Sequence, residues 1–222
     1  MPDVLEPITK RTLPPGKSAS GGEVLTLRGV SFTTFARLAA ELGDSSRPRL
    51  CYDNPLLELR MPSEEHEELN RIAALMVTLI FGEWDVEARD LGSMTHESEA
   101  TDKGFEPDTC FYADEEKGGV TVSIPLLAIK AEFTNSAINK LPVYAAFGMP
   151  ELWRLSVDGD GAIRARFHIL RDGIYTEQGV SSVLAPLTPD ILVGFLSSRL
   201  KTRRLGAWIK SVQEWARDSR AV

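Results

Sequence analysis

Two short apolar runs that each carry charged side chains constrain the fold of this chain more than any other feature. The first run reads E-P-D-T-C-F-Y from Glu106, and the second reads P-L-L-A-I-K-A-E from Pro125. Alternate side chains of a strand point to one face, so Lys130 and Glu132 share a face of the second run, while Asp108 opens the first. Charged groups inside apolar strands are costly to bury unless they are paired or bound to a metal. The pattern therefore predicts either a salt-bridged patch or a functional site.

Composition limits the class of protein. The chain has 222 residues, 43% of them hydrophobic and 26% charged, which is typical of one globular domain with a substantial core. No apolar run approaches the roughly 20 residues that a membrane span requires, and the N-terminus lacks the apolar segment of a signal peptide. Cys51 and Cys110 are too few for a zinc cage beside only three histidines. We expect a cytoplasmic protein without a membrane partner.

Charge is unevenly distributed. The formal net charge of -7 argues against general coating of a polyanion. The most basic segment is C-terminal, and its cations are candidate DNA-backbone contacts: Arg199, Lys201, Arg203 and Arg204. The same segment carries an apolar stripe at helical spacing, which favours a second interpretation, namely an amphipathic helix that packs on its own domain or on a second copy.

The remaining periodicity predicts three parts of the chain: a flexible tail over residues 1–22, a main domain over 23–197 and a C-terminal amphipathic helix over 198–222. Within the domain we expect strand 23–27, helix 32–42 capped by Ser31, a hairpin of 49–52 and 56–61, and a helix that runs from its cap Ser63 to Gly82. In the first turn of that helix we expect His66 to pack at the edge of the core. Strand 84–91 and a polar loop over 92–104 follow, and then the two charged strands and a helix opened by Asn135 or Ser136. A meander of 151–157, 162–170 and 174–177, a strand near 182–184 and a helix over 189–196 complete the domain. This predicts an α+β fold with a central mixed sheet.

Several segments of the chain, taken in order, resemble one known family. They are L-R-G-V-S-F-T-T-F, L-C-Y-D, L-E-L-R-M-P-S-E-E-H-E, L-G-S-M-T, K-G-F-E-P-D-T-C-F-Y and N-S-A-I-N-K-L-P-V-Y-A-A-F-G-M-P-E-L-W-R, running from about Leu27 to Arg154. They are similar to the bacterial restriction-endonuclease family known as Uma-two, in the PD-(D/E)XK nuclease superfamily. The resemblance implies a restriction-endonuclease-like core, with a mixed sheet flanked by helices and followed by a β-meander and a helix.

The resemblance also implies a chemistry. Such proteins hydrolyse DNA phosphodiesters with Mg²⁺ or Mn²⁺, which favours oxygen ligands and stabilises the charge that develops on the phosphoryl group. The implied metal ligands are Asp108 and Glu132, with Glu67 completing the shell. The implied catalytic lysine is Lys140 from the following helix, or Lys130 itself. A homodimer is implied for cutting both strands.

One residue departs from the family pattern. Relatives usually carry a glutamate at the position of Lys130, so this chain has lysine-x-acid where they have acid-x-acid. An ammonium at that position lowers cation affinity by repulsion, and it can pair with Asp108 in place of the metal. Two functions stay open at this point. One is a metal-dependent endonuclease, and the other is a catalytically impaired protein of the same fold that binds DNA or another protein.

Overall fold

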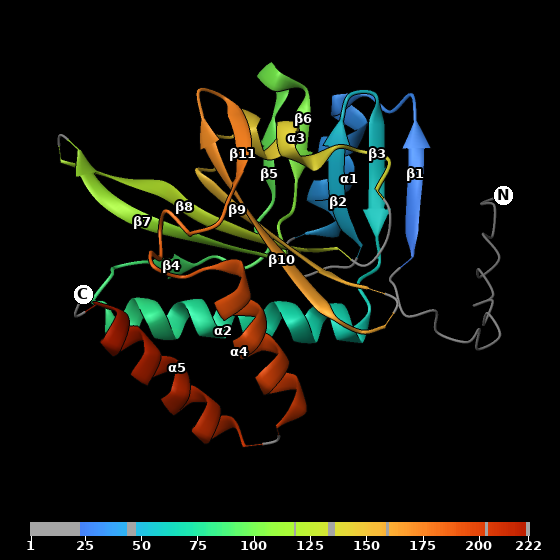
Figure 1. Ribbon diagram of the computed structural model, residues 1–222. Coiled ribbons are helices and arrows are strands. Elements are labelled where there is room, and N and C mark those ends of the chain that lie inside the picture. The colour runs from blue at the N-terminus through green and yellow to red at the C-terminus, as the bar shows by residue number, and fades with distance from the viewer. Residues whose placement is uncertain are drawn as a thin grey trace, which may run out of the picture.

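The computed structural model describes residues 23–43, 48–117, 119–132, 136–158, 160–202 and 204–220. Within these residues the chain forms an α+β fold of two β-sheets and five α-helices (Figure 1). The α+β class is confirmed, but the strands divide into two sheets where a single central sheet was expected. The predicted N-terminal tail, residues 1–22, lies outside the described residues.

The smaller sheet is antiparallel throughout. Its five strands follow the order β1 (Val24–Arg28), β3 (Leu56–Arg60), β2 (Arg49–Asp53), β6 (Lys103–Phe105) and β5 (His96–Ser98). Helix α1 (Phe32–Leu42) covers it, and the ring of Phe35 stacks on Tyr52 with centroids 4.9 Å apart. The side chain of Ser31 accepts a hydrogen bond from the amide of Thr34, so the predicted cap of this helix is confirmed.

The larger sheet is mixed, as the sequence predicted for the charged strands. Its six strands follow the order β11 (Ile174–Gln178), β10 (Ile163–Arg171), β9 (Glu151–Val157), β8 (Val120–Glu132), β7 (Thr109–Lys117) and β4 (Arg89–Asp90). The pair β8–β9 is parallel and the other pairs are antiparallel. Parallel neighbours need a crossover connection, and the chain supplies it through α3 (Lys140–Ala146). The predicted β-meander is confirmed as β9, β10 and β11.

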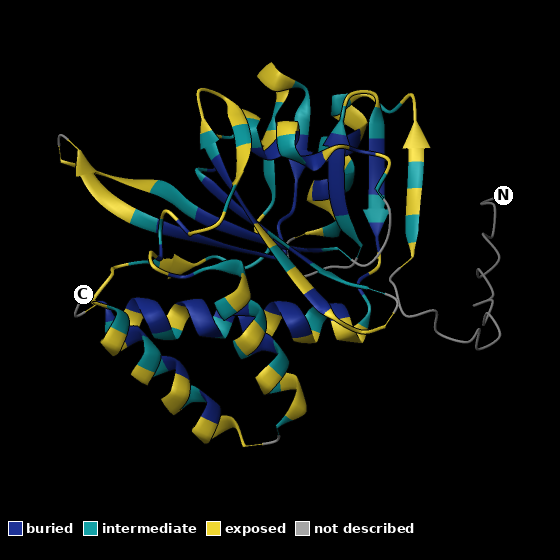
Figure 2. Ribbon diagram, in the orientation of Figure 1, coloured by how far each residue is buried: buried dark blue, intermediate teal, exposed yellow. Residues whose placement is uncertain are grey.

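Three helices pack on one side of the larger sheet, opposite α3. They are α2 (Glu64–Glu83), α4 (Pro189–Lys201) and α5 (Leu205–Arg220), and they enclose the main core with Phe111, Leu127 and Ile129 of the sheet (Figures 1 and 2). In α5 the stripe of Trp208, Val212 and Ala216 is buried in this core. The C-terminal helix therefore packs on its own domain, as one of the two sequence interpretations proposed.

Two predictions around the end of α2 are wrong. Residues 84–91 were expected to form a strand, but only Arg89–Asp90 does so. Trp84 instead ends α2, where its indole donates a hydrogen bond to the carbonyl of Ala216 at 2.7 Å. The expected loop over 92–104 contains β5 and most of β6, because His96 stacks on Phe105 with centroids 4.7 Å apart.

Three other boundaries also differ from expectation. The helix after β8 begins at Lys140, where the side chain of Asn139 accepts a hydrogen bond from the amide of Leu141. The proposed start at Asn135 lies outside the described residues. No strand forms near 182–184, because the carboxylate of Glu151 accepts the amides of Ser182 and Val183. Helix α4 continues past residue 196 to Lys201, and Thr202 interrupts the path to α5. No helix among the described residues is long and apolar enough to cross a membrane.

Candidate functional site

The predicted site residues converge at one end of β8, and a buried ion pair lies at their centre. The Nζ atom of Lys130 lies 2.8 Å from Oδ1 of Asp108, and only 4% and 3% of these residues is exposed. Lys130 also donates to the carbonyl of Glu106 at 3.4 Å. Strand β7 begins one residue after Asp108, and β8 pairs alongside it, so the sheet register brings the two side chains together.

The second oxygen of Asp108 is also fully engaged. Its Oδ2 atom accepts the backbone amide of Ala131 at 2.8 Å and lies 3.2 Å from Nε2 of His66. The same nitrogen lies 2.9 Å from the carbonyl oxygen of Ala131. Both neighbours are acceptors, so Nε2 carries the hydrogen. His66 therefore ties the first turn of α2 to the ends of β7 and β8.

These contacts decide the ionisation of the aspartate. Burial by itself would raise the pKa of the Asp108 carboxyl, but the Lys130 ammonium and the hydrogen bond from His66 lower it well below its ordinary value. Asp108 is thus an anion at neutral pH, and Lys130 supplies its nearest positive charge.

Glu132 belongs to a second ion-pair group beside the first. Its Oε2 atom accepts hydrogen bonds from Nε and Nη2 of Arg154 at 3.0 and 2.6 Å, and its Oε1 atom lies 3.6 Å from Nζ of Lys140. Burial opposes its ionisation, yet the charges of Lys140 and Arg154 keep the pKa of Glu132 below its ordinary value. Two cations therefore share this one carboxylate.

Lys140 is the most perturbed cation of the site. It is almost fully buried in the first turn of α3, and burial together with the neighbouring charges of Lys130 and Arg60 lowers its pKa to about 8. Its closest carboxylate, that of Glu132, is held more tightly by Arg154. Positive charge is consequently in excess around this amine.

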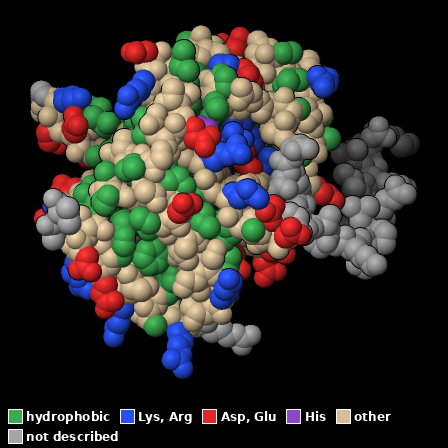
Figure 3. Space-filling view, in the orientation of Figure 1, with side chains coloured by type: hydrophobic (Ala, Val, Ile, Leu, Met, Phe, Trp, Pro, Cys, Tyr) green, Lys and Arg blue, Asp and Glu red, His purple; other side chains and the backbone are tan. Residues whose placement is uncertain are grey.

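A cleft of about 870 Å³ opens beside Glu132. It is lined by the loop before α3, by β9 and by one cation of β10, and the lining includes Ser136, Asn139, Lys140, Arg154 and Arg166. Figure 3 shows a group of Lys and Arg side chains near the middle of this face, close to α3. The polar lining and the excess of cations suit an anionic ligand.

Two arginines of the cleft lie directly opposite one another. Arg154 of β9 and Arg166 of β10 are paired residues in the antiparallel register. Like charges in this arrangement destabilise a sheet, so the pair costs stability in the absence of a ligand. Arg154 is balanced by Glu132, whereas no ion pair joins Arg166 to another described residue.

The residues predicted to bind Mg²⁺ or Mn²⁺ do not fit a metal ion in this arrangement. Mg²⁺ needs carboxylate oxygens in its own coordination shell. Both oxygens of Asp108 are occupied by Lys130, Ala131 and His66, and Glu132 is held by Arg154. Within the described ranges, no group of three or more His, Cys, Asp or Glu residues could hold a metal ion. The metal site therefore remains a prediction that requires Lys130 to move.

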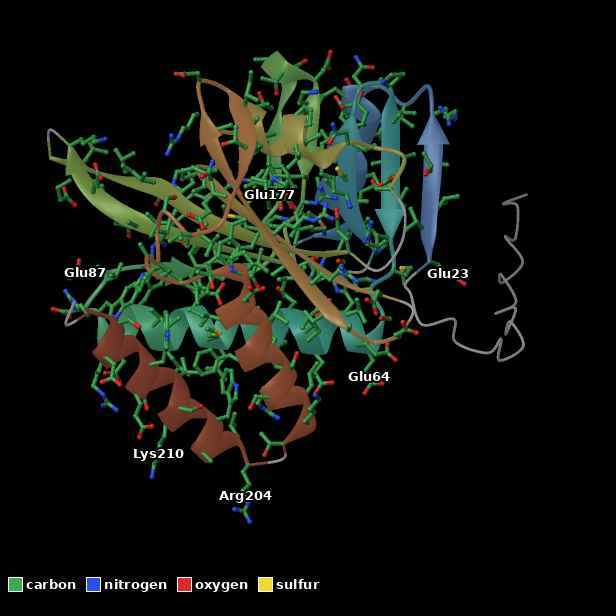
Figure 4. The ribbon with its side chains drawn as sticks, viewed as in Figure 1. Glu23, Glu64, Glu87, Glu177, Arg204 and Lys210 are labelled. Atoms are coloured by element: carbon green, nitrogen blue, oxygen red, sulfur yellow. The ribbon has the colours of Figure 1, made fainter. Side chains whose placement is uncertain are left out.

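Two other groups of predicted residues lie apart from this cluster. Glu67 is partly exposed and lies 3.9 Å from Nδ1 of His66, so it reaches the cluster only through that histidine. Arg199, Lys201 and Arg204 lie at the α4–α5 junction, and Figure 4 shows Arg204 at the end of the molecule away from α3. Arg199 donates to the carbonyl of Thr202 at 3.0 Å, and Arg203 lies outside the described residues. Lys201 ends α4 in an exposed position.

Sequence reasoning missed three residues of the site. His66 was expected to pack at the core edge, but it contacts Asp108; its signal was its position three residues after the cap Ser63, in the first turn of a helix. Arg154 and Arg166 lie in strands of the meander that showed only sheet alternation. Their proximity to Glu132 depends on the β8–β9–β10 order, which alternation does not encode.

Comparisons of the chain with models of known protein families and with curated proteins give no significant match. The family resemblance thus rests on the ordered sequence segments alone.

Proposed function

We propose that this protein binds nucleic-acid phosphates in the basic cleft without hydrolysing them, and that it derives from a metal-dependent nuclease. The observation that carries the proposal is the contact of 2.8 Å between Lys130 and Asp108. In the nuclease pattern that the sequence resembles, the corresponding carboxylate binds a divalent cation. Here an ammonium of the chain itself neutralises it.

The buried pair is neutral overall and supplies no metal chemistry. A metal-dependent nuclease needs the cation to lower the pKa of a bound water and to contact the phosphoryl oxygens. A lysine held by Asp108 and by the carbonyl of Glu106 has no coordination site for a water nucleophile. Because it neutralises Asp108, that carboxylate does not offset the cations that line the cleft.

The cleft favours nucleic acid over a general polyanion surface. Lys140, Arg154 and Arg166 line it, against the single carboxylate of Glu132, while the whole chain is acidic at -7. Binding confined to one basic cleft involves few phosphates, so we expect modest affinity that falls steadily with salt. The exposed cations Lys201 and Arg204 at the α4–α5 junction do not line this cleft.

The experiment is fluorescence anisotropy of a labelled oligonucleotide, single-stranded and duplex, in buffer with EDTA. Wild type is expected to bind without metal, and Arg166→Gln is expected to weaken binding several-fold and to lower the salt slope by about 1. The matched control is Arg164→Gln, which changes the same strand two residues away, where Arg164 pairs with Asp158. Equal binding by the two variants, or binding that requires Mg²⁺, would refute the proposal.

A second candidate is the metal-dependent endonuclease itself. The observation that favours it is that Asp108, Lys130, Glu132 and Lys140 do gather at one end of β8. Plasmid cleavage with Mg²⁺ or Mn²⁺ separates the two candidates. Cleavage by wild type that Asp108→Ala abolishes would establish the endonuclease. Cleavage by Lys130→Glu but not by wild type would show that the lysine has inactivated a nuclease.

A further inference from the structure

A small cavity next to the basic cleft contains polar groups that the cluster described above leaves unused. It has room for about one water-sized atom, about 10 Å³, and Lys140 lines both this cavity and the cleft. Its other polar lining residues come from five segments of the chain: Arg49, Glu58, Arg60, Glu106, Lys130 and Tyr144.

Three donors in this lining lack a partner within the described residues. They are Nη2 of Arg60, the hydroxyl of Tyr144 and Nε of Arg49. Arg60 is 5% exposed and Tyr144 is 1% exposed. Buried donors are rarely left without an acceptor, because each costs the free energy of its lost hydration.

The two carboxylates of the lining accept their hydrogen bonds from other groups. The carboxylate of Glu58 accepts from Ser136 Oγ at 2.7 Å and from the amide of Ala137 at 2.5 Å. The carboxylate of Glu106 accepts from the amide of Leu50 and from the hydroxyl of Thr95, both at 3.2 Å. The cavity therefore presents three donors without an acceptor among the described residues, and its four cations outnumber its two carboxylates.

We propose that this cavity receives one oxygen of a terminal phosphate, so that the protein selects nucleic acid by its phosphorylated end. This inference rests on the proposed function and assigns a ligand class to the same cleft. Arg60, Tyr144 and Lys140 hold the oxygen that enters the cavity, and Arg154 and Arg166 contact the part of the ligand in the cleft.

Charge favours an end over an internal linkage. A phosphodiester inside a strand has chain on both sides and exposes two unesterified oxygens that share one negative charge. A terminal phosphate monoester has three free oxygens and chain on one side only. Its greater negative charge also suits the several cations of this lining.

The test measures the affinity of wild type in EDTA for short oligonucleotides of one sequence: unphosphorylated, 5′-phosphorylated and 3′-phosphorylated. One phosphorylated form is expected to bind about tenfold tighter than the unphosphorylated form, as one to two additional charged hydrogen bonds would produce. Tyr144→Phe is expected to remove most of that preference.

Tyr144→Phe is a sharp probe because it removes only a hydroxyl that has no partner in the described part of the chain. Its melting temperature is therefore expected to equal or exceed that of wild type. The matched control is Tyr175→Phe, whose hydroxyl donates to the carbonyl of Met149 at 2.6 Å. This variant is expected to lose stability and to keep the preference for the phosphorylated end.

The outcomes are distinguishable. Equal wild-type affinity for all three oligonucleotides overturns the end preference and leaves phosphate binding in the cleft intact. The absence of binding to any oligonucleotide overturns both proposals. A preference that Tyr144→Phe and Tyr175→Phe reduce equally also overturns the assignment to this cavity.

Discussion

Lys130 and Asp108 form a buried ion pair across neighbouring strands, with Nζ and Oδ1 2.8 Å apart. Removing one member of such a pair leaves an uncompensated charge in the interior, which costs about 3–5 kcal/mol. We expect Lys130→Met and Asp108→Asn each to lower the free energy of unfolding in urea, Lys130→Met by about that amount. The double variant should lose less than the sum of the two, and strict additivity would show that the two groups do not interact.

The low pKa of Asp108 predicts a loss of stability in acid. Its folded-state pKa lies below the ordinary value near 3.9, so its stabilising contribution is present above about pH 4 and is lost as the pH falls toward the folded-state value. As the pH falls through the acid range, the free energy of unfolding measured in urea should decrease more steeply for wild type than for Asp108→Asn. Parallel pH profiles for the two proteins would contradict the stabilising role of ionised Asp108.

Replacing Lys130 by glutamate should create a cation site. The change removes the ammonium and places a second carboxylate beside Asp108, which is the oxygen donor set that Mg²⁺ and Mn²⁺ prefer. A ligand that binds only the folded state raises the melting temperature, so Mn²⁺ should stabilise Lys130→Glu and leave wild type unchanged. Lys130→Gln is the control for simple loss of charge, and stabilisation of wild type by Mn²⁺ would favour the endonuclease instead.

Lys140 predicts a rise in stability toward alkaline pH. Its folded-state pKa of about 8 lies below the unfolded value near 10.4, so between these values the unfolded chain binds a proton that the folded chain does not. The free energy of unfolding contributed by this group therefore increases with pH in that interval. Wild type should gain stability relative to Lys140→Met from about pH 7 to about pH 10, and a constant difference between the two proteins across that interval would contradict this prediction.

Close packing around Gly104 of β6 predicts that any side chain at this position would disturb the smaller sheet. A Cβ atom at this position would overlap the ring of Phe35, which is fully buried in the α1 core. Gly104→Ala should destabilise the protein by about 1–3 kcal/mol in urea unfolding. In Gly82→Ala the added methyl meets no atom within 4 Å, and because this residue lies in α2 the change should be neutral or stabilising. Equal effects of the two changes would contradict this packing.

Local signals accounted for much of the fold. Ser31 and Ser63 cap the helices that they were predicted to cap, and the hairpin at residues 49–60 and the three-stranded meander follow from alternation and turn residues. These features depend on hydrogen bonds and side-chain spacing within a few residues. The prediction failed where a distant contact decided the local structure, as at Trp84, whose indole bonds to Ala216 in place of a strand partner.

The sequence by itself determined which charged groups this protein carries in its apolar strands, and the lysine at position 130 left two alternatives open: a pairing with Asp108 or a catalytic lysine beside a metal. Only the tertiary structure decided that Glu132 is shared by Arg154 and Lys140, that Arg166 faces Arg154, and that Arg60 and Tyr144 line one small cavity. The physical reason is that a charge's partners are set by sheet order and register. These depend on burying the whole core, and no local stretch of sequence encodes them.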